Sequence, residues 1–133
     1  MKLVISSILI ALFVALTSCS DVSPNAVELT LDYTWEGFSP CLPGTNPEIR
    51  VSGIPEDTKY LVVSMSHSGF SDGEQKIAYE GSGIITKDSL DKIDGPCDLP
   101  IGTNRFKYKV EAFNEKGDII GVGSKARDYP DKK

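Results

Sequence analysis

The stretch that decides the fold runs from Gly95 to Phe113 and reads GPCDLPIGTNRFKYKVEAF. Its first half is rich in glycine and proline, which favour turns, and it contains one cysteine, Cys97. From Arg105 onward, apolar and charged residues alternate strictly. The apolar set is Phe106, Tyr108, Val110 and Ala112, and the charged set is Arg105, Lys107, Lys109 and Glu111. This period predicts a β-strand with one buried face, held beside a rigid loop that could present a site.

The same alternation appears before and after this stretch. Residues 28–36 predict a strand whose inward residues are Leu29, Leu31, Tyr33 and Trp35. Residues 48–52 predict a short strand with Ile49 and Val51 inward. Residues 59–66 are almost continuously apolar, which predicts a central strand buried on both faces.

Residues 114–117 predict a tight hairpin turn, and residues 118–124 predict the returning strand. Gly121 and Gly123 in that strand indicate an edge, a bulge or the close approach of another segment. Short strands are predicted at 76–80 and 84–85, after a loop at 67–74. Residues 86–93 predict one or two helical turns, with Leu90 and Ile93 on one face. The pattern as a whole predicts a mainly β, two-sheet antiparallel fold with little helix.

The N-terminal residues predict a secretion signal. Lys2 precedes an apolar run that ends at Leu16, which is shorter than the about 20 residues of a membrane span. The tetrapeptide Leu16-Thr17-Ser18-Cys19 resembles a bacterial lipobox, in which the cysteine is lipidated and becomes the new N-terminus. An ordinary secretory signal with an incidental cysteine is the alternative.

This interpretation divides the chain into a signal peptide (1–18), a lipidated tether (19–27), a β domain (28–128) and a polar tail (129–133). Ser20 stands where aspartate would signal retention in the inner membrane. We therefore expect a bacterial cell-envelope protein anchored through Cys19, at the outer membrane facing the periplasm if the host has one.

Charge and composition exclude several functions. The formal net charge is −5, and the chain has only three arginines, so bulk electrostatics disfavour a nucleic-acid partner. One histidine and the absence of CxxC and HxxxH spacings argue against a metal site, and we expect no cofactor.

Lipidation of Cys19 would leave Cys41 and Cys97 in an oxidising compartment, where an even pair predicts a disulfide. The bridge would close a loop of about 57 residues and contribute about 4 kcal/mol in the chain-entropy model. Two free thiols or half a metal site are the alternatives.

Three segments together resemble one protein family. Residues 46–65 read NPEIRVSGIPEDTKYLVVSM, residues 95–106 read GPCDLPIGTNRF, and residues 118–121 read DIIG. In the phosphatidylethanolamine-binding protein family, a similar early motif leads into the central strand, and a GPCPP-x-G-x-HRY segment leads into a later one. The closest relatives would be the bacterial Raf-kinase-inhibitor-like proteins. The resemblance implies two antiparallel sheets and a small pocket that takes phosphate or a phospholipid head group.

The chain departs from the family at the pocket. The acidic loop after the central strand is replaced by SHSGF at 66–70, and residues 72–75 lack the family's histidine. Asn104 replaces the histidine of the HRY motif, whereas Arg105 is retained. The resemblance therefore implies Arg105, Asn104 and His67 as candidate ligand-binding residues, since guanidinium groups suit phosphate.

No catalytic residue is predicted. His67 has no obvious acid partner in the sequence and no cysteine nucleophile beside it, so we expect a protein that is not an enzyme. The first hypothesis is an anchored domain that binds a small anionic ligand weakly or has lost that ability. The alternative is a structural or interaction lipoprotein of the envelope with no small-molecule site.

Overall fold

Strand β7 (Arg105–Phe113) forms the middle of the larger of two sheets, between β4 (Tyr60–His67) and β8 (Ile119–Asp128). The computed structural model describes residues 22–37, 41–97 and 105–131. Five strands make the larger sheet in the order β1-β8-β7-β4-β5, and three make the smaller sheet in the order β2-β3-β6. The remaining strands are β1 (Val22–Glu28), β2 (Thr30–Asp32), β3 (Ile49–Ser52), β5 (Phe70–Ala78) and β6 (Ile84–Ile85).

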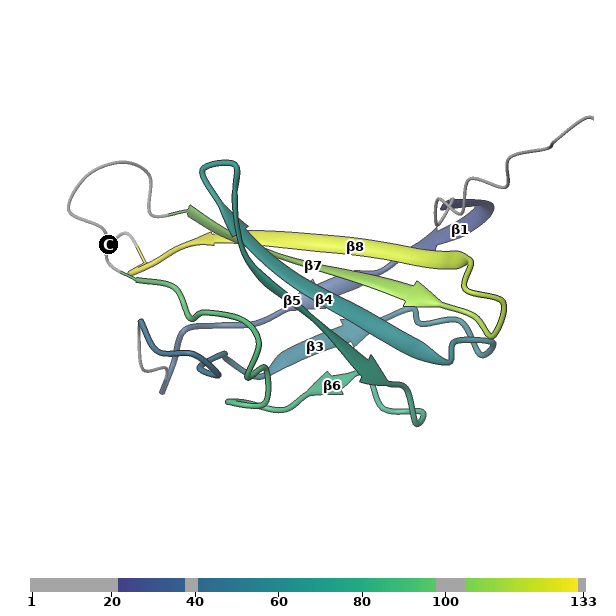
Figure 1. Cartoon of the computed structure of the whole chain (residues 1–133), viewed down its shortest axis with the longest axis horizontal. Coiled ribbons are helices and arrows are strands. Elements are labelled where there is room, and N and C mark those ends of the chain that lie inside the picture. Colours follow the sequence, from purple (N-terminus) through teal and green to yellow (C-terminus); the bar gives the residue numbers. More distant parts are fainter. Residues whose placement is uncertain (1–21, 38–40, 98–104, 132–133) are drawn as a thin grey trace, which may run out of the picture.

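The two sheets form two layers (Figure 1). All strand pairs are antiparallel except β1 with β8, which run parallel. The mainly β, two-sheet prediction is therefore confirmed. Among the described residues, no helix is long and apolar enough to cross a membrane.

The core between the layers consists of the side chains that the alternation placed inward. On β7 the buried set is Phe106, Tyr108, Val110 and Ala112, and facing residues include Leu29, Leu31, Tyr33, Trp35, Ile49 and Val51. Tyr108 and Tyr33 meet edge to face with ring centroids 5.2 Å apart. The alternation of apolar residues therefore predicted the buried face of these strands correctly, because their other face is open to solvent.

Strand β4 is less buried than its apolar sequence predicts. Leu61, Val63 and Met65 are buried, but the residues between them are only half-buried. In a two-layer fold, one face of the larger sheet has no covering layer, so β4 keeps one core face rather than two.

The predicted loop at 67–74 is wrong, because β5 already begins at Phe70. Ser68 and Gly69 alone connect β4 to β5, and both have positive φ (46° and 81°). Two consecutive residues in the left-handed backbone conformation form a type I′ turn, whose twist matches that of the two strands of a hairpin. The polar residues that suggested a loop are instead the exposed side of an edge strand.

The helical turns predicted at 86–93 are also wrong; the segment is a series of turns, although Leu90 and Ile93 are buried as expected. The fully buried Asn46 organises it. Its side-chain oxygen accepts from the backbone N–H groups of Ser89 and Leu90 at 3.0 and 2.9 Å, and its amide donates to Thr86 O at 3.0 Å. The backbone donors that a helix would use are satisfied by a residue from another loop, so a helix is not needed.

The N-terminal boundary of the domain differs from the prediction. Residues 22–28, expected as a tether, form β1 and pair with β8, with Val27 opposite Gly121. Residues 19–21 lie outside the described residues.

At the C-terminal end of the domain, β8 continues to Asp128, and the ring of Tyr129 packs against Trp35, with ring centroids 5.5 Å apart, rather than starting a polar tail. The tight turn at 114–117 is confirmed, with Gly117 at φ 82°.

Candidate functional site

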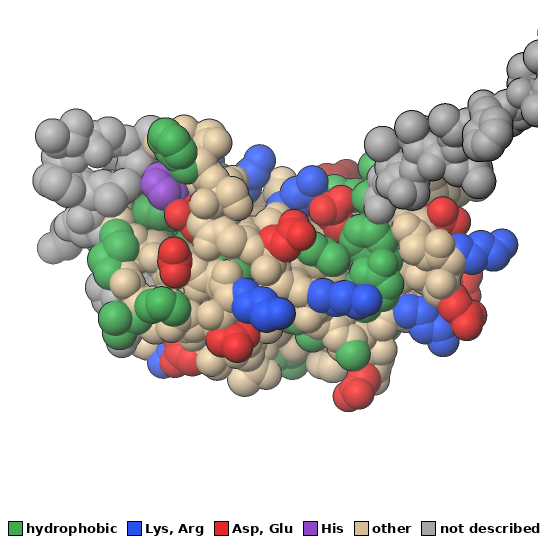
Figure 2. Space-filling view, viewed as in Figure 1, with side chains coloured by type: hydrophobic (Ala, Val, Ile, Leu, Met, Phe, Trp, Pro, Cys, Tyr) green, Lys and Arg blue, Asp and Glu red, His purple; other side chains and the backbone are tan. Residues whose placement is uncertain are grey.

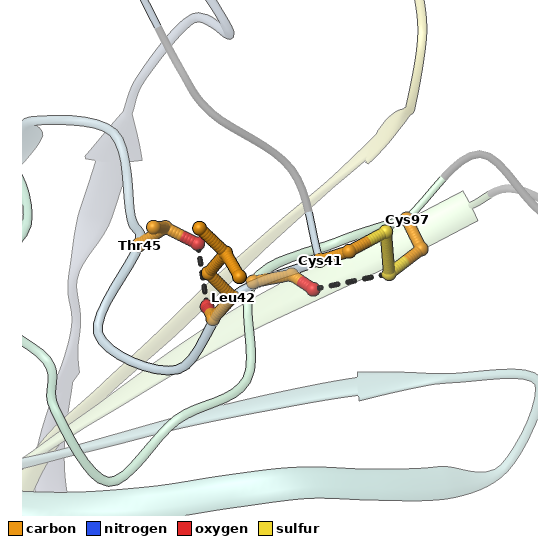
Figure 3. The surroundings of a disulfide bond; sticks show 5 residues. Cys41, Leu42, Thr45 and Cys97 are labelled. Carbon is orange, nitrogen blue, oxygen red and sulfur yellow. Dashed lines mark hydrogen bonds between the residues drawn. A yellow bond between two sulfur atoms is a disulfide. The ribbon is translucent and has the colours of Figure 1, made fainter.

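One end of the two-layer fold is fixed by the predicted disulfide, which the structure confirms between Cys41 and Cys97 (Figure 3). Their Cα atoms lie 4.8 Å apart. Backbone hydrogen bonds reinforce the junction, because Cys41 N–H donates to Pro96 O at 3.2 Å and Gly95 N–H donates to Leu42 O at 3.1 Å. The hydroxyl of Thr45 donates to Leu42 O at 2.6 Å and closes the turn that follows Cys41. Two loops distant in sequence therefore form one rigid wall.

His67 lies at the same end, at the last position of β4. Its ring packs against Phe106, with ring centroids 5.1 Å apart, and its Nδ1 lies 2.6 Å from Oδ2 of Asp72. Both side chains are largely buried, at 21% and 14% exposed. The sequence offered no acid partner for His67, and that interpretation is wrong. The tight turn at Ser68 and Gly69 folds β5 back along β4 and brings Asp72 to the imidazole.

A cleft of about 350 Å³ opens beside this pair. We call it the disulfide cleft; its lining residues are Cys41, Pro43, His67, Asp72, Asp94, Gly95, Cys97 and Phe106. The backbone N–H of Asp94 donates to Asp72 O at 2.9 Å, which holds the loop that carries Asp94 against β5. Figure 2 shows the histidine (purple) at one end of the molecule, with acidic and hydrophobic side chains beside it.

A second, shallower depression of about 330 Å³ lies on the uncovered side of the larger sheet. We call it the outer hollow; it is lined by Ser66, His67, Ser68, Gly69, Arg105, Lys107 and Ala126. Arg105 and Lys107 flank the buried Phe106 on β7, so both point away from the core. Arg105 also lies 3.7 Å from Asp128 on β8.

The structure brings together only part of the predicted ligand-binding set. Arg105 and His67 both border the outer hollow, but the ring of His67 packs on Phe106, which faces the opposite side from Arg105. Asn104 and Cys19 lie outside the described residues. The sequence placed Lys107 only in the charged set of the predicted strand, without a binding role. Nothing in the sequence indicated Asp72 or Asp94, because only the hairpin and the loop contact place them at the cleft.

Two tyrosines lie deep in the core near this end. Burial raises the pKa of Tyr33 and of Tyr108, and electrostatic repulsion of a Tyr108 phenolate by the neighbouring Tyr33 and Asp72 raises the pKa of Tyr108 further. Both hydroxyls therefore stay protonated. The Tyr33 hydroxyl donates to Lys125 O at 2.8 Å, whereas the hydroxyl of Tyr108 has no hydrogen-bond partner among the described residues. Within the same residues, no group of three or more histidine, cysteine or acidic side chains could hold a metal ion.

Comparison of the chain with protein-family models, curated proteins and solved structures gives no match.

Proposed function

We propose that the protein is a lipid-anchored envelope protein that binds a small anion in the outer hollow and is not an enzyme. The observation that carries the proposal is that Arg105 and Lys107 border the same hollow, together with the hydroxyl-bearing Ser66 and Ser68. A guanidinium fork and an ammonium group are the usual protein partners of phosphate, and serine hydroxyls can donate to its remaining oxygens.

The surrounding charges favour weak binding. The whole chain has a net charge of −5, and Asp128 beside Arg105 competes with an incoming anion. Lys107 has no carboxylate within ion-pair distance among the described residues, so its charge is the more available of the two. Because the hollow is open to water, screening by salt should weaken binding markedly.

The resemblance to the phosphatidylethanolamine-binding protein family also implies that the protein binds an anion, because Arg105 is the retained residue of the HRY motif. Membership of that family is part of the same proposal and rests on the motif segments alone. That the protein is not an enzyme is part of the same proposal. The disulfide leaves neither Cys41 nor Cys97 as a free thiol nucleophile.

We expect inorganic phosphate at millimolar concentration to raise the thermal unfolding temperature of the mature protein, because a ligand that binds only the folded state stabilises it. Arg105→Gln and Lys107→Gln should each weaken phosphate binding by about tenfold, as expected for the loss of one charge-assisted hydrogen bond. Binding is measured by a phosphate titration against a sodium chloride titration of equal ionic strength.

Lys109→Gln is the matched control. Lys109 is the next outward residue on β7, but it does not line the hollow and lies 3.7 Å from Glu111. If all three variants bind phosphate more weakly by the same factor, the loss results from the change in net charge and not from a specific site. A wild-type protein that responds equally to phosphate and chloride would contradict the anion proposal.

The anchor has its own test. Cys19→Ala should move the protein from the membrane fraction to the soluble fraction, because two or more acyl chains give stable anchoring and their attachment needs the thiol. Immunoblots of membrane and soluble fractions from the same cells measure the shift, and Cys19→Ala should also lack the mass of the lipid. Unchanged partitioning would contradict lipidation at Cys19.

The alternative, an interaction lipoprotein, has one specific observation in its favour. Phe70 and Leu42 have 68% and 57% of their surface exposed and belong to the hairpin and loop of this end. Large apolar side chains left in water can mark a protein interface. The alternative gains support if phosphate fails to raise the thermal unfolding temperature. It further expects Phe70→Ser and Leu42→Ser, at positions that do not line the outer hollow, to abolish the function of the protein in cells.

A further inference from the structure

The disulfide cleft differs in charge from the outer hollow. Its lining residues include two aspartates, Asp72 and Asp94, and one histidine, but no lysine or arginine among the residues that the structure describes. The remaining walls are the disulfide, the ring of Phe106, Pro43 and Gly95. An anion entering here would meet two aspartates with no lysine or arginine beside them, so the ligand of the outer hollow does not suit this cleft.

The hydrogen-bonding groups of the cleft are mainly acceptors. Carboxylates accept only, and in the tautomer whose Nδ1–H donates to Asp72 the imidazole presents an acceptor lone pair at Nε2. The carboxylate of Asp72 keeps further acceptor capacity after this bond. A ligand that satisfies such a site must bring donors, and an ammonium group brings three of them together with the opposite charge.

The shape and burial of the cleft add to this selection. A volume of about 350 Å³ lies at the small end of ligand sites, so it suits a compact molecule. Pro43 and the disulfide offer apolar surface for a short carbon body, with the buried ring of Phe106 behind them. The side chain of Asp72 is only 14% exposed, which strengthens its attraction for a cation relative to a carboxylate in open water.

We infer that the disulfide cleft binds a small organic cation, namely a primary ammonium on a short apolar body, with its charge between Asp72 and Asp94. Asp72 is fixed by His67 and by the backbone contact to Asp94, so the site is pre-organised before the ligand arrives. The inference is independent of the anion site, because the two sites use different side chains apart from His67 and opposite charges.

The test titrates the mature protein with n-butylammonium chloride and follows the imidazole signals of the single histidine by NMR. We expect saturable shifts with n-butylammonium. The same concentrations of n-butanol and of sodium butyrate should give no saturable shift, since the first lacks the charge and the second has the wrong sign. Equal shifts with butanol or butyrate would overturn the inference.

Asp94→Asn is the decisive variant, and it should weaken n-butylammonium binding at least fivefold. Asp91→Asn is its matched control, because Asp91 is an exposed aspartate of the same loop that does not line the cleft. Asp72→Asn should abolish binding and move the resting His67 signals. If Asp94→Asn binds as tightly as Asp91→Asn, the inference is wrong. Because phosphate binding is measured separately through Lys107→Gln, failure of either site leaves the other result intact.

Discussion

Gly123→Ala is expected to lower the free energy of unfolding by about 3 kcal/mol, the upper part of the range for overpacking a core. Gly123 lies on β8, where the segment that links β1 to β2 crosses the sheet. A Cβ atom there would overlap the carbonyl oxygen of Leu29, and it would lie 2.8 Å from both the carbonyl carbon and the Cβ of the same residue. These atoms are backbone or next to it, so no rotamer change relieves the overlap, and the N-terminal segment must move off the sheet.

Gly121→Ala is the control, because its added Cβ meets the same residue at a different atom. The nearest contact is 3.0 Å from Leu29 Cδ2, the end of a side chain that can rotate. We expect a loss of about 1 kcal/mol for this variant. Urea unfolding followed by the fluorescence of Trp35 compares the two. Equal midpoints would contradict the claim that the backbone of Leu29 sets the requirement for glycine.

These glycines illustrate what the sequence could predict. A glycine pair in an apolar strand indicated close approach, an edge or a bulge, and the structure shows close approach, by Leu29. The strand faces of β7 and of residues 29–35 followed from alternation, because burial on one face of a sheet enforces a period of two. Such patterns are local, so they can be read without knowing the partner strand.

The errors arose where a distant residue decides the local structure. Asn46 takes the backbone donors that a helix at 86–93 would have used. β5 is polar because it is an edge strand with one face in water, and β1 is mostly exposed for a similar reason. At the candidate sites, the alternation of β7 placed Arg105 and Lys107 on one face. The pairing of His67 with Asp72 could not be predicted, because it depends on the Ser68–Gly69 turn.

The second large effect concerns the disulfide. Cys41→Ser with Cys97→Ser should lower the free energy of unfolding by about 4 kcal/mol, because the bridge closes a long loop in the unfolded chain and limits its conformations. The sequence separation between the two cysteines is 56. Since small domains have total stabilities of about 5–15 kcal/mol, the loss is a large fraction of the total.

Urea unfolding of the double variant and of the oxidised wild type measures this difference. Wild type that has been reduced and alkylated should approach the double variant, which separates the missing bond from the effect of the serine side chains. The backbone bonds from Cys41 to Pro96 and from Gly95 to Leu42 are expected to persist in the folded variant, because each of them joins main-chain atoms. The double variant should therefore keep the fold at room temperature while unfolding at a lower urea concentration.

The double variant Cys41→Ser with Cys97→Ser also distinguishes the effect of the disulfide on stability from its effect on ligand binding. The outer hollow contains neither cysteine, so phosphate binding by the folded double variant should be unchanged. Both cysteines line the disulfide cleft, so the double variant should bind n-butylammonium more weakly even when it is fully folded. An unchanged unfolding midpoint would contradict the prediction that the bridge stabilises the fold by restricting the conformations of the unfolded chain.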